Sequence, residues 1–172
     1  MKFFVGVLLV FFLLFPLPVF AESSYVLPYP SFMPGSTLYV LHGVLEKFEK
    51  YWYFGNFSKF IYNLKLSDKY LVEAKTLFEY KQYLLGSKAL EKSKTYFVAA
   101  YRSLGEAKKE GKNISQKEQL LKEAVGKHIE VLMQVKGIVP QYFKWTPEKD
   151  RSEELFLWKQ IDEGVEIRKN CT

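Results

Sequence analysis

The chain has 172 residues, with 25 Lys and Arg against 19 Asp and Glu, and its apolar fraction of 48% is enough to build a hydrophobic core. Its length suits one domain of ordinary size. Cys171 is the only cysteine, which excludes an intramolecular disulfide, so stability must come from the core. We expect the Cys171 thiol either to stay free on an exposed tail or to link two chains.

Residues 1–21 predict a cleavable secretory signal peptide. Lys2 precedes the run Phe3–Phe15, which is apolar apart from one glycine and is followed by two prolines. Val19 and Ala21 then occupy the positions of a small-residue cleavage site. The alternative is an uncleaved membrane anchor, but a spanning helix needs about 20 apolar residues. We therefore expect export to the periplasm, the cell surface or the extracellular space.

Residues 22–36 predict an extended arm. The segment Tyr25–Pro34 contains three prolines, which exclude a regular helix and favour a polyproline-like conformation. The arm also carries tyrosine, leucine, phenylalanine and methionine side chains that would be costly to leave in water. We expect it to lie along the helical body; binding in a groove of another protein is the alternative.

Residues 37–139 predict an antiparallel bundle of amphipathic helices. The first helix begins at the cap Ser36 or Thr37 and ends before Gly55-Asn56; the second is capped by Ser58, and the third covers Gln82–Glu110. Their expected buried faces are Leu38, Leu41, Leu45, Phe48 and Trp52; Phe60, Leu64, Ser67, Leu71, Ala74 and Phe78; and Gly86, Leu90, Ser93, Phe97, Ala100, Leu104 and Ala107. Small residues alternate with large ones in the last two faces, which predicts a closely packed helical hairpin.

Two more helices are expected toward the C-terminus. Ser115 and Glu118 form the pattern of a capping box, and the helix that follows should bury Leu121, Val125, His128, Leu132 and Val135 before it ends at Gly137. Residues 140–172 predict a C-terminal helical segment packed on the bundle. It begins with Thr146 as cap and buries Leu155, Trp158, Ile161 and Val165. No strand pattern is evident, so the predicted fold is an all-α bundle of about five helices.

Two surfaces are candidates for binding. Residues 80–127 hold eleven Lys and Arg against five Glu, a surplus that attracts an anionic polymer or a membrane surface. The candidate residues are Lys81, Lys88, Lys92, Lys94, Arg102, Lys108, Lys109 and Lys112. Pairs such as Glu106 with Lys109 equally fit a solvated helix face. The second candidate is an aromatic surface formed by Tyr51, Tyr53, Phe54 and Phe57. No specific nucleic-acid motif is present.

Catalytic and metal-binding patterns are missing from the sequence. His42 and His128 lie in separate predicted helices without a second ligand at metal-site spacing, and His128 fits a satisfied imidazole on a buried face. Asp68 and Glu73 are five residues apart, so they point about 140° from each other on a helix. We expect Asp68 to pair with a lysine across the bundle. The sequence therefore predicts no enzyme, no cofactor and no metal.

A resemblance to a known family rests on three segments. They are Tyr25-Val-Leu-Pro-Tyr-Pro, then Pro34-Gly35 before Leu38-Tyr39-Val40-Leu41, and Leu66–Ala74. They resemble an uncharacterised family of exported prokaryotic helical proteins, a domain of unknown function with a Leu-Pro-Gly turn before Leu-Tyr-x-Leu-Lys. This chain differs at Met33, where leucine is usual, and at His42, where lysine is usual. The likeness covers roughly residues 25 to 110 and implies export and an arm followed by helices, but no activity.

Three functions follow as expectations. The first is a non-enzymatic binding or structural module of the cell envelope or extracellular space, which contacts another component through exposed helix faces. The second is an electrostatic binder of anionic polymers or lipid headgroups through the basic residues. The third is a carrier of a small apolar ligand held between helices. The sequence leaves open which partner it binds and in which oligomeric state.

Overall fold

The computed structural model describes residues 25–30, 32–148 and 151–171; the predicted signal peptide lies outside them. The elements are α2 (Thr37–Glu49), the 3₁₀ turn η1 (Lys50–Trp52), α3 (Asn56–Glu79), α4 (Tyr83–Lys109), α5 (Ser115–Ile138), β1 (Phe143–Trp145), β2 (Glu153–Leu155) and α6 (Leu157–Lys169). The predicted helical bundle is therefore confirmed. None of the described helices is long and apolar enough to cross a membrane.

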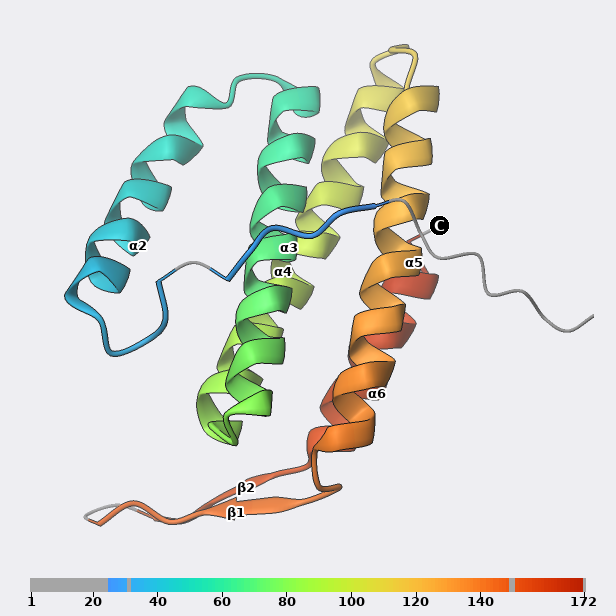
Figure 1. The fold of residues 1–172 in the computed structure, drawn as a ribbon. Helices are drawn as coiled ribbons and strands as arrows, with labels where there is room; N and C mark the ends of the chain where they lie inside the picture. Colours follow the sequence, from blue (N-terminus) through green and yellow to red (C-terminus); the bar gives the residue numbers. More distant parts are fainter. Residues whose placement is uncertain (1–24, 31, 149–150, 172) are drawn as a thin grey trace, which may run out of the picture.

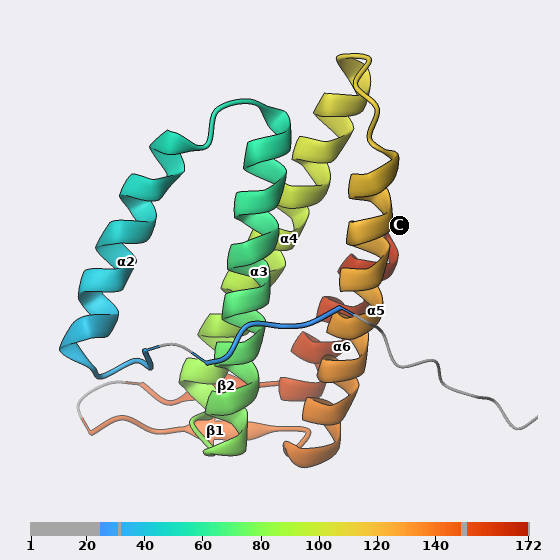
Figure 2. The ribbon, with the colours of Figure 1, turned by 45° about the horizontal axis from the view of Figure 1, so that its top comes forward.

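The helices run alternately up and down (Figure 1). Helices α3 and α4 form a long antiparallel pair, α5 continues beside them, and the shorter α6 packs behind α5. Helix α2 lies on the far side of α3 from α5, and Figure 2 shows the same order after rotation. Strands β1 and β2 form a hairpin at the end of the bundle where α3 meets α4. The bundle proper is thus made by α3 to α6, with α2 attached to one side.

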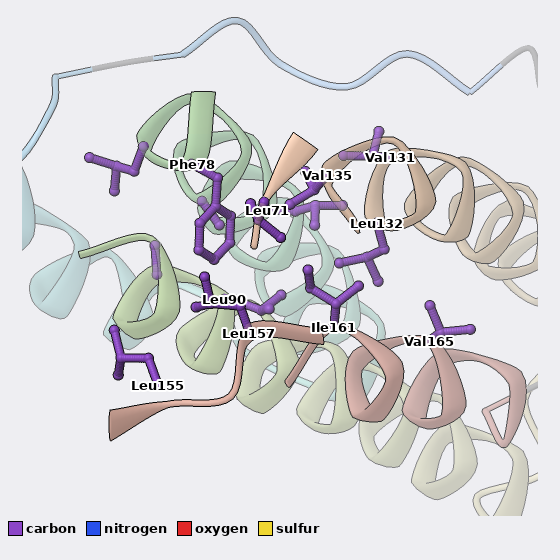
Figure 3. Packing of buried hydrophobic residues seen from close by; sticks show 14 residues of the cluster. Leu71, Phe78, Leu90, Val131, Leu132, Val135, Leu155, Leu157, Ile161 and Val165 are labelled. Atoms are coloured by element: carbon purple, nitrogen blue, oxygen red, sulfur yellow. The ribbon is translucent and has the colours of Figure 1, made fainter. Parts of the chain in front are cut away.

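Two large clusters of buried side chains form the core. The first includes Leu71, Phe78, Leu90, Leu132 and Ile161, and Figure 3 shows these side chains converging from α3, α4, α5 and α6. The second lies toward the α4–α5 turn and is built around residues such as Phe60, Phe97, Leu104, Leu121 and Ala124. The predicted buried faces of the second, third and fourth helices are all buried, as expected.

Helices α3 and α4 approach closely because small residues face large ones. A Cβ added at Gly86 would lie 2.7 Å from the ring of Phe78, so this position requires glycine. Near the middle of the pair, Ser67 Oγ donates a hydrogen bond to Ser93 O at 3.0 Å, and Ser93 Oγ donates to Ser67 O at 2.8 Å. The predicted closely packed hairpin is therefore confirmed.

Helices α3 and α4 end in similar turns with different residues. After α3, Lys81 takes a positive φ of 59°, and Gln82 N donates to Leu77 O at 2.8 Å. After α4, Gly111 has a φ of 76°, and Lys112 N donates to Ala107 O at 3.1 Å. This six-to-one hydrogen bond closes many helices and favours glycine at the left-handed position. Lys81 is the unusual member of the pair.

The arm can be followed through residues 25–30 and from residue 32 to α2. Neither part contains helix or strand before Thr37. Leu27 and Met33 pack against the first large cluster, and Tyr25 packs against the second. In both overall views the segment crosses the face of α3 on its way from α5 toward α2 (Figures 1 and 2). Its apolar side chains thus take part in covering the bundle.

The region after α5 corrects three expectations, one of which is the burial of Trp158, which is 39% exposed. The predicted helix start at Thr146 is wrong, because residues 146–152 connect two short antiparallel strands and α6 begins only at Leu157. The expectation of no sheet fails for the same reason. The hairpin pairs Phe143 with Leu155, and the Phe143 ring packs 4.7 Å from the ring of Tyr83 on α4. Leu155 therefore enters the core from a strand.

Two predicted helix caps are also wrong. Helix α3 begins at Asn56, so Ser58 lies inside its first turn. Helix α5 begins at Ser115 itself, whose N–H donates to Asn113 Oδ1 at 3.1 Å. Glu118 makes no capping box and instead lies 3.6 Å from Lys108 on α4. At the start of α5, the side-chain oxygen of Asn113 therefore supplies the hydrogen-bond acceptor that was expected from the Ser115 hydroxyl.

Candidate functional site

Helix α2 and the turn that follows it expose most of their large apolar side chains. The exposed residues are Leu38, Val40, Leu41, Val44, Leu45, Phe48, Tyr51, Trp52 and Phe54, with exposed fractions from 44% to 79%. At 100° per residue, those from Leu38 to Trp52 occupy an arc of about 160°. We call these nine residues the outer face of α2. The expected burial of Leu38, Leu41, Leu45, Phe48 and Trp52 is therefore wrong.

The opposite side of α2 contacts the bundle through polar groups. Glu46 is buried, its carboxylate pairs with Lys69 of α3, and it accepts a hydrogen bond from the Tyr70 hydroxyl at 2.9 Å. Tyr62 donates to the backbone oxygen of Glu46 at 2.8 Å. Two turns nearer the N-terminus, Tyr39 donates to Glu73 Oε1 at 2.9 Å. These bonds fix which side of α2 faces outward.

Burial perturbs the titratable groups beneath α2. It raises the pKa of Tyr62 to about 12 and raises the pKa of Tyr70 further, with a contribution from its hydrogen bond to Glu46. Burial also raises the pKa of Glu73, although the Tyr39 hydroxyl and Lys92 oppose the shift. The second carboxylate oxygen of Glu73 has no hydrogen-bond partner among the described residues. The tyrosines therefore stay protonated and act as donors at neutral pH.

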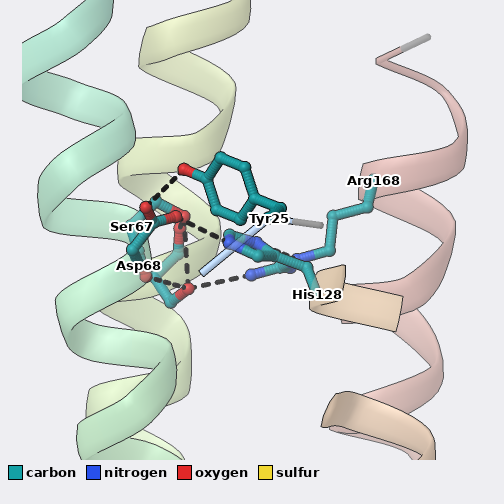
Figure 4. A network of polar contacts seen from close by, with 6 residues as sticks. Tyr25, Ser67, Asp68, His128 and Arg168 are labelled. Carbon is teal, nitrogen blue, oxygen red and sulfur yellow. Dashed lines mark hydrogen bonds and ion pairs between the residues drawn. The ribbon is translucent and has the colours of Figure 1, made fainter. Parts of the chain in front are cut away.

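A second group of polar residues lies inside the bundle, between the two large clusters. Asp68 Oδ1 lies 2.7 Å from His128 Nε2, and Asp68 Oδ2 accepts a hydrogen bond from Tyr25 at 2.6 Å. Arg168 donates from Nε to His128 Nδ1 at 3.1 Å and from Nη2 to Ser93 Oγ at 2.8 Å. Figure 4 shows these groups meeting from α3, α5, α6 and the arm. We call Tyr25, Ser67, Asp68, Ser93, His128 and Arg168 the polar layer.

The hydrogen bonds define the protonation of the polar layer. Arg168 is a donor only, so His128 Nδ1 must accept, and His128 Nε2–H then donates to Asp68. Burial lowers the pKa of His128, as does Arg168, while Asp68 raises it. Burial lowers the pKa of Arg168 to about 10, so the guanidinium remains charged at neutral pH. A neutral imidazole thus joins a buried cation to a buried anion.

The polar layer is enclosed by the bundle. His128 and Arg168 have no solvent-exposed surface, and their neighbours above and below are apolar. The interpretation of His128 as a satisfied imidazole on a buried face is confirmed. The expected partner of Asp68 is wrong, because Asp68 binds a histidine and a tyrosine where a lysine was predicted. Asp68 and His128 lie sixty residues apart, so no local spacing could reveal their contact.

The predicted basic residues do not form one surface. Lys88 and Lys92 are exposed, and the Lys92 ammonium lies 4.8 Å from the ring centre of Tyr70 beneath α2. The prediction that Lys94 belongs to an anion-binding surface is wrong, because Lys94 is only 6% exposed and pairs with Glu91 and Glu163. The remaining residues lie in the turn after α3, on the second half of α4 or just beyond it: Lys81, Arg102, Lys108, Lys109 and Lys112.

The predicted aromatic surface is divided in a similar way. Tyr51 and Phe54 are exposed and belong to the outer face of α2. Tyr53 is half-buried, with its ring 4.8 Å from the ring of Tyr62. Phe57 is half-buried beneath the Lys112 ammonium, which lies 5.5 Å from its ring centre. Sequence reasoning found the aromatic end of α2 but missed the apolar side chains that continue it along the helix.

Two further observations limit the chemistry of the site. Within the described parts of the chain, no three His, Cys, Asp or Glu side chains are grouped so that they could hold a metal ion. The expectation that Cys171 lies on an exposed tail is wrong. Cys171 is 7% exposed in the second large cluster, and burial raises the pKa of its thiol.

No family model matches the chain, and comparisons with curated proteins and with solved structures gave no match.

Proposed function

We propose that this chain is an exported, non-enzymatic binding module that attaches to a lipid bilayer through the outer face of α2. The observation that carries this proposal is the orientation of α2, whose polar side is hydrogen-bonded to the bundle and whose apolar side is in water. Contiguous exposed apolar surface is a mark of a binding site. Export is supported by the sequence pattern of residues 1–21.

A bilayer suits this face better than a protein groove does. A bilayer needs no shape complementarity from a single convex helix, and apolar residues with aromatic neighbours are typical of helices that lie in the membrane interface. Tyr51, Trp52 and Phe54 follow directly after the helix, where an aromatic side chain can sit at the level of the headgroups. The positive net charge of the chain favours approach to an anionic membrane.

The alternative of a helix that rotates to bury its apolar side is disfavoured by the contacts beneath it. Rotation would break the ion pair of Glu46 with Lys69 and the hydrogen bond of Tyr39 with Glu73, and it would leave the Lys69 ammonium and the Glu73 carboxylate against apolar groups. Each charged hydrogen bond lost at a buried site costs about 1.5–3 kcal/mol. Transfer of the outer face into lipid requires no such loss.

The test is flotation of the mature chain, residues 22–172, with vesicles of phosphatidylcholine alone and with added phosphatidylglycerol. We expect Phe48→Glu to lower the fraction bound by about tenfold, because a buried phenyl ring contributes about 1.5–3 kcal/mol and the new charge resists insertion. Met133→Glu on α5 is the matched control, since Met133 is 53% exposed and Phe48 is 60% exposed. The control should bind as the unmodified chain does.

Three outcomes would contradict the proposal. An equal loss of vesicle binding in Phe48→Glu and Met133→Glu would mean that the outer face of α2 makes no specific contribution to binding. Binding to anionic vesicles alone, with full release by salt, would favour the electrostatic binder of headgroups. Sedimentation as a dimer, with Phe48→Glu producing a monomer, would assign the outer face to a second copy or another protein.

A further inference from the structure

A cavity of about 640 Å³ lies between the second half of α4 and the first half of α5. Its floor is apolar and includes Val98, Leu104, Ile114 and Leu121, and Cys171 is also among the lining residues. Four cationic side chains and two glutamates line it as well. The volume is in the range of about 300–1,000 Å³ that is typical of small-molecule sites.

The cavity exists because α6 is too short to cover the pair α4–α5. Helices α4 and α5 have 27 and 24 residues, whereas α6 has 13. Arg168, near the end of α6, reaches the polar layer, and Cys171 is the last described residue to pack on the second cluster. Figure 1 shows α6 alongside only one half of α5. The other half of the groove between α4 and α5 is left for the cavity.

The charges around the cavity are not balanced. Lys109 lies 2.9 Å from Glu106, and Lys108 lies 3.6 Å from Glu118, so the two glutamates are already paired. Arg102 on α4 and Lys122 on α5 have no ion pair with any residue that the structure describes. An apolar floor with two unneutralised cations at its rim is complementary to a molecule that has an apolar chain and one anionic head.

We propose that this cavity binds a single-chain amphiphilic anion, with the acyl chain on the apolar floor and a carboxylate or phosphate head held by Arg102 and Lys122. The site makes no use of α2, so it is independent of membrane attachment by the outer face. The candidate basic residues Arg102, Lys108 and Lys109 come together here, which gives part of the predicted anionic surface a specific role.

The first experiment fills the cavity without touching its charges. Gly105 lines the cavity, and a Cβ added there meets no atom within 4 Å, so Gly105→Leu can fold and occupy the ligand space. Gly126 on α5 is equally open but does not line the cavity, so Gly126→Leu is the matched control. Calorimetric titration with dodecanoate should show binding to the unmodified chain and to Gly126→Leu, and a loss of about tenfold or more in Gly105→Leu.

The second experiment tests the anionic head. Dodecanoate and dodecyl phosphate distinguish the two head groups, and dodecanol is the neutral comparison. The double variant Arg102→Gln, Lys122→Gln should weaken the preferred anion by about tenfold or more and leave dodecanol unchanged, whereas Lys88→Gln elsewhere on α4 should change neither. Because Cys171 is the only cysteine, the rate of thiol labelling reports on the cavity, and a bound anion should slow it.

The result that overturns the proposal is equally specific. It fails if dodecanol binds as tightly as both anions, if Gly105→Leu binds as the unmodified chain does, or if Cys171 is labelled at the same rate with and without dodecanoate. Vesicle binding that persists in Gly105→Leu would leave the outer face of α2 intact as a membrane site, so the two proposals succeed or fail separately.

Discussion

Arg168 is the residue on which the buried polar contacts converge. Its guanidinium contacts His128, Ser93 and the backbone oxygen of Gly164, and its central carbon lies 5.1 Å from the ring centre of Phe97. We predict that Arg168→Met destabilises the protein by about 3–5 kcal/mol, because it leaves the Asp68 carboxylate buried without its cation. Urea unfolding measures this loss. The exposed neighbour substitution Lys169→Met should stay within about 0.5 kcal/mol of the unmodified chain.

His128 makes stability depend on pH. Its pKa is lowered below 6.5 in the folded chain, so the unfolded chain binds the proton more readily. Stability from the neutral imidazole is complete above about pH 6.5 and is lost as the pH falls below that value, by up to about 1.4 kcal/mol per pH unit. The difference in unfolding free energy between the unmodified chain and His128→Gln, measured from pH 7 to pH 5, isolates this effect. A difference that does not change with pH would contradict it.

Lys81 carries backbone strain that its counterpart Gly111 avoids. Both residues occupy the left-handed region in turns with the same hydrogen bond, and an L-residue there costs about 1–2 kcal/mol relative to glycine. We predict that Lys81→Gly stabilises the protein by about 0.5–1 kcal/mol and that Gly111→Ala destabilises it by a similar amount. Thermal and urea unfolding of the two variants should move in opposite directions. Loss of stability in both would mean that the Lys81 side chain makes contacts that outweigh its strain.

At the scale of elements, α2 is the helix whose attachment is mainly polar. We predict that Glu46→Ala speeds amide hydrogen exchange of residues 38–49 by about tenfold or more, because it removes the contacts with Lys69 and Tyr70, while α3 and α4 keep their protection. Glu49→Ala is the control, since Glu49 makes only a partly exposed pair with Lys65 at 3.9 Å. Faster exchange throughout the chain would show that α2 unfolds only together with the bundle.

The sequence predicted α3, α4 and α5 well because their apolar periodicity and their burial agree. In α4 the expected range of Gln82–Glu110 differs from the observed one by a residue at each end. The same periodicity predicted α2 as a helix but placed its apolar side inward. A periodic pattern shows that a helix has one apolar and one polar side, but it does not show which of the two sides packs against another element of the fold. Tyr39 and Glu46, seven residues apart on the polar side, were the signal that was missed.

The C-terminal region was harder to predict for a different reason. Each strand has three residues, too few for an alternating pattern, and Thr146-Pro147-Glu148 has the composition of a helix start as well as of a turn. The polar layer was also beyond sequence reasoning, apart from the burial of His128. Its members come from four helices and the arm, and only the folded chain brings Tyr25, Asp68 and Arg168 together.

At the scale of the whole molecule, each bundle helix passes from one large cluster through the polar layer to the other. On α5 the order is Leu121, His128 and Leu132, and on α6 it is Ile161, Arg168 and then Cys171 beyond the helix end. Such a layer disfavours a helix that slides by one turn, because a charge would then enter an apolar cluster. The polar layer therefore specifies the register of the bundle helices, and α2 presents its apolar side on the outside of that bundle.

The most direct test of the central claim uses the environment of single tryptophans on vesicles. Trp52 lies on the outer face of α2, whereas Trp145 lies in the hairpin. In a chain with Trp145 and Trp158 replaced by phenylalanine, we predict that phosphatidylcholine vesicles shift the Trp52 emission to the blue and that brominated lipid quenches it. A chain that retains only Trp145 should show neither change. Unchanged Trp52 emission in the presence of vesicles, or quenching of Trp145 to the same extent, would contradict membrane attachment through α2.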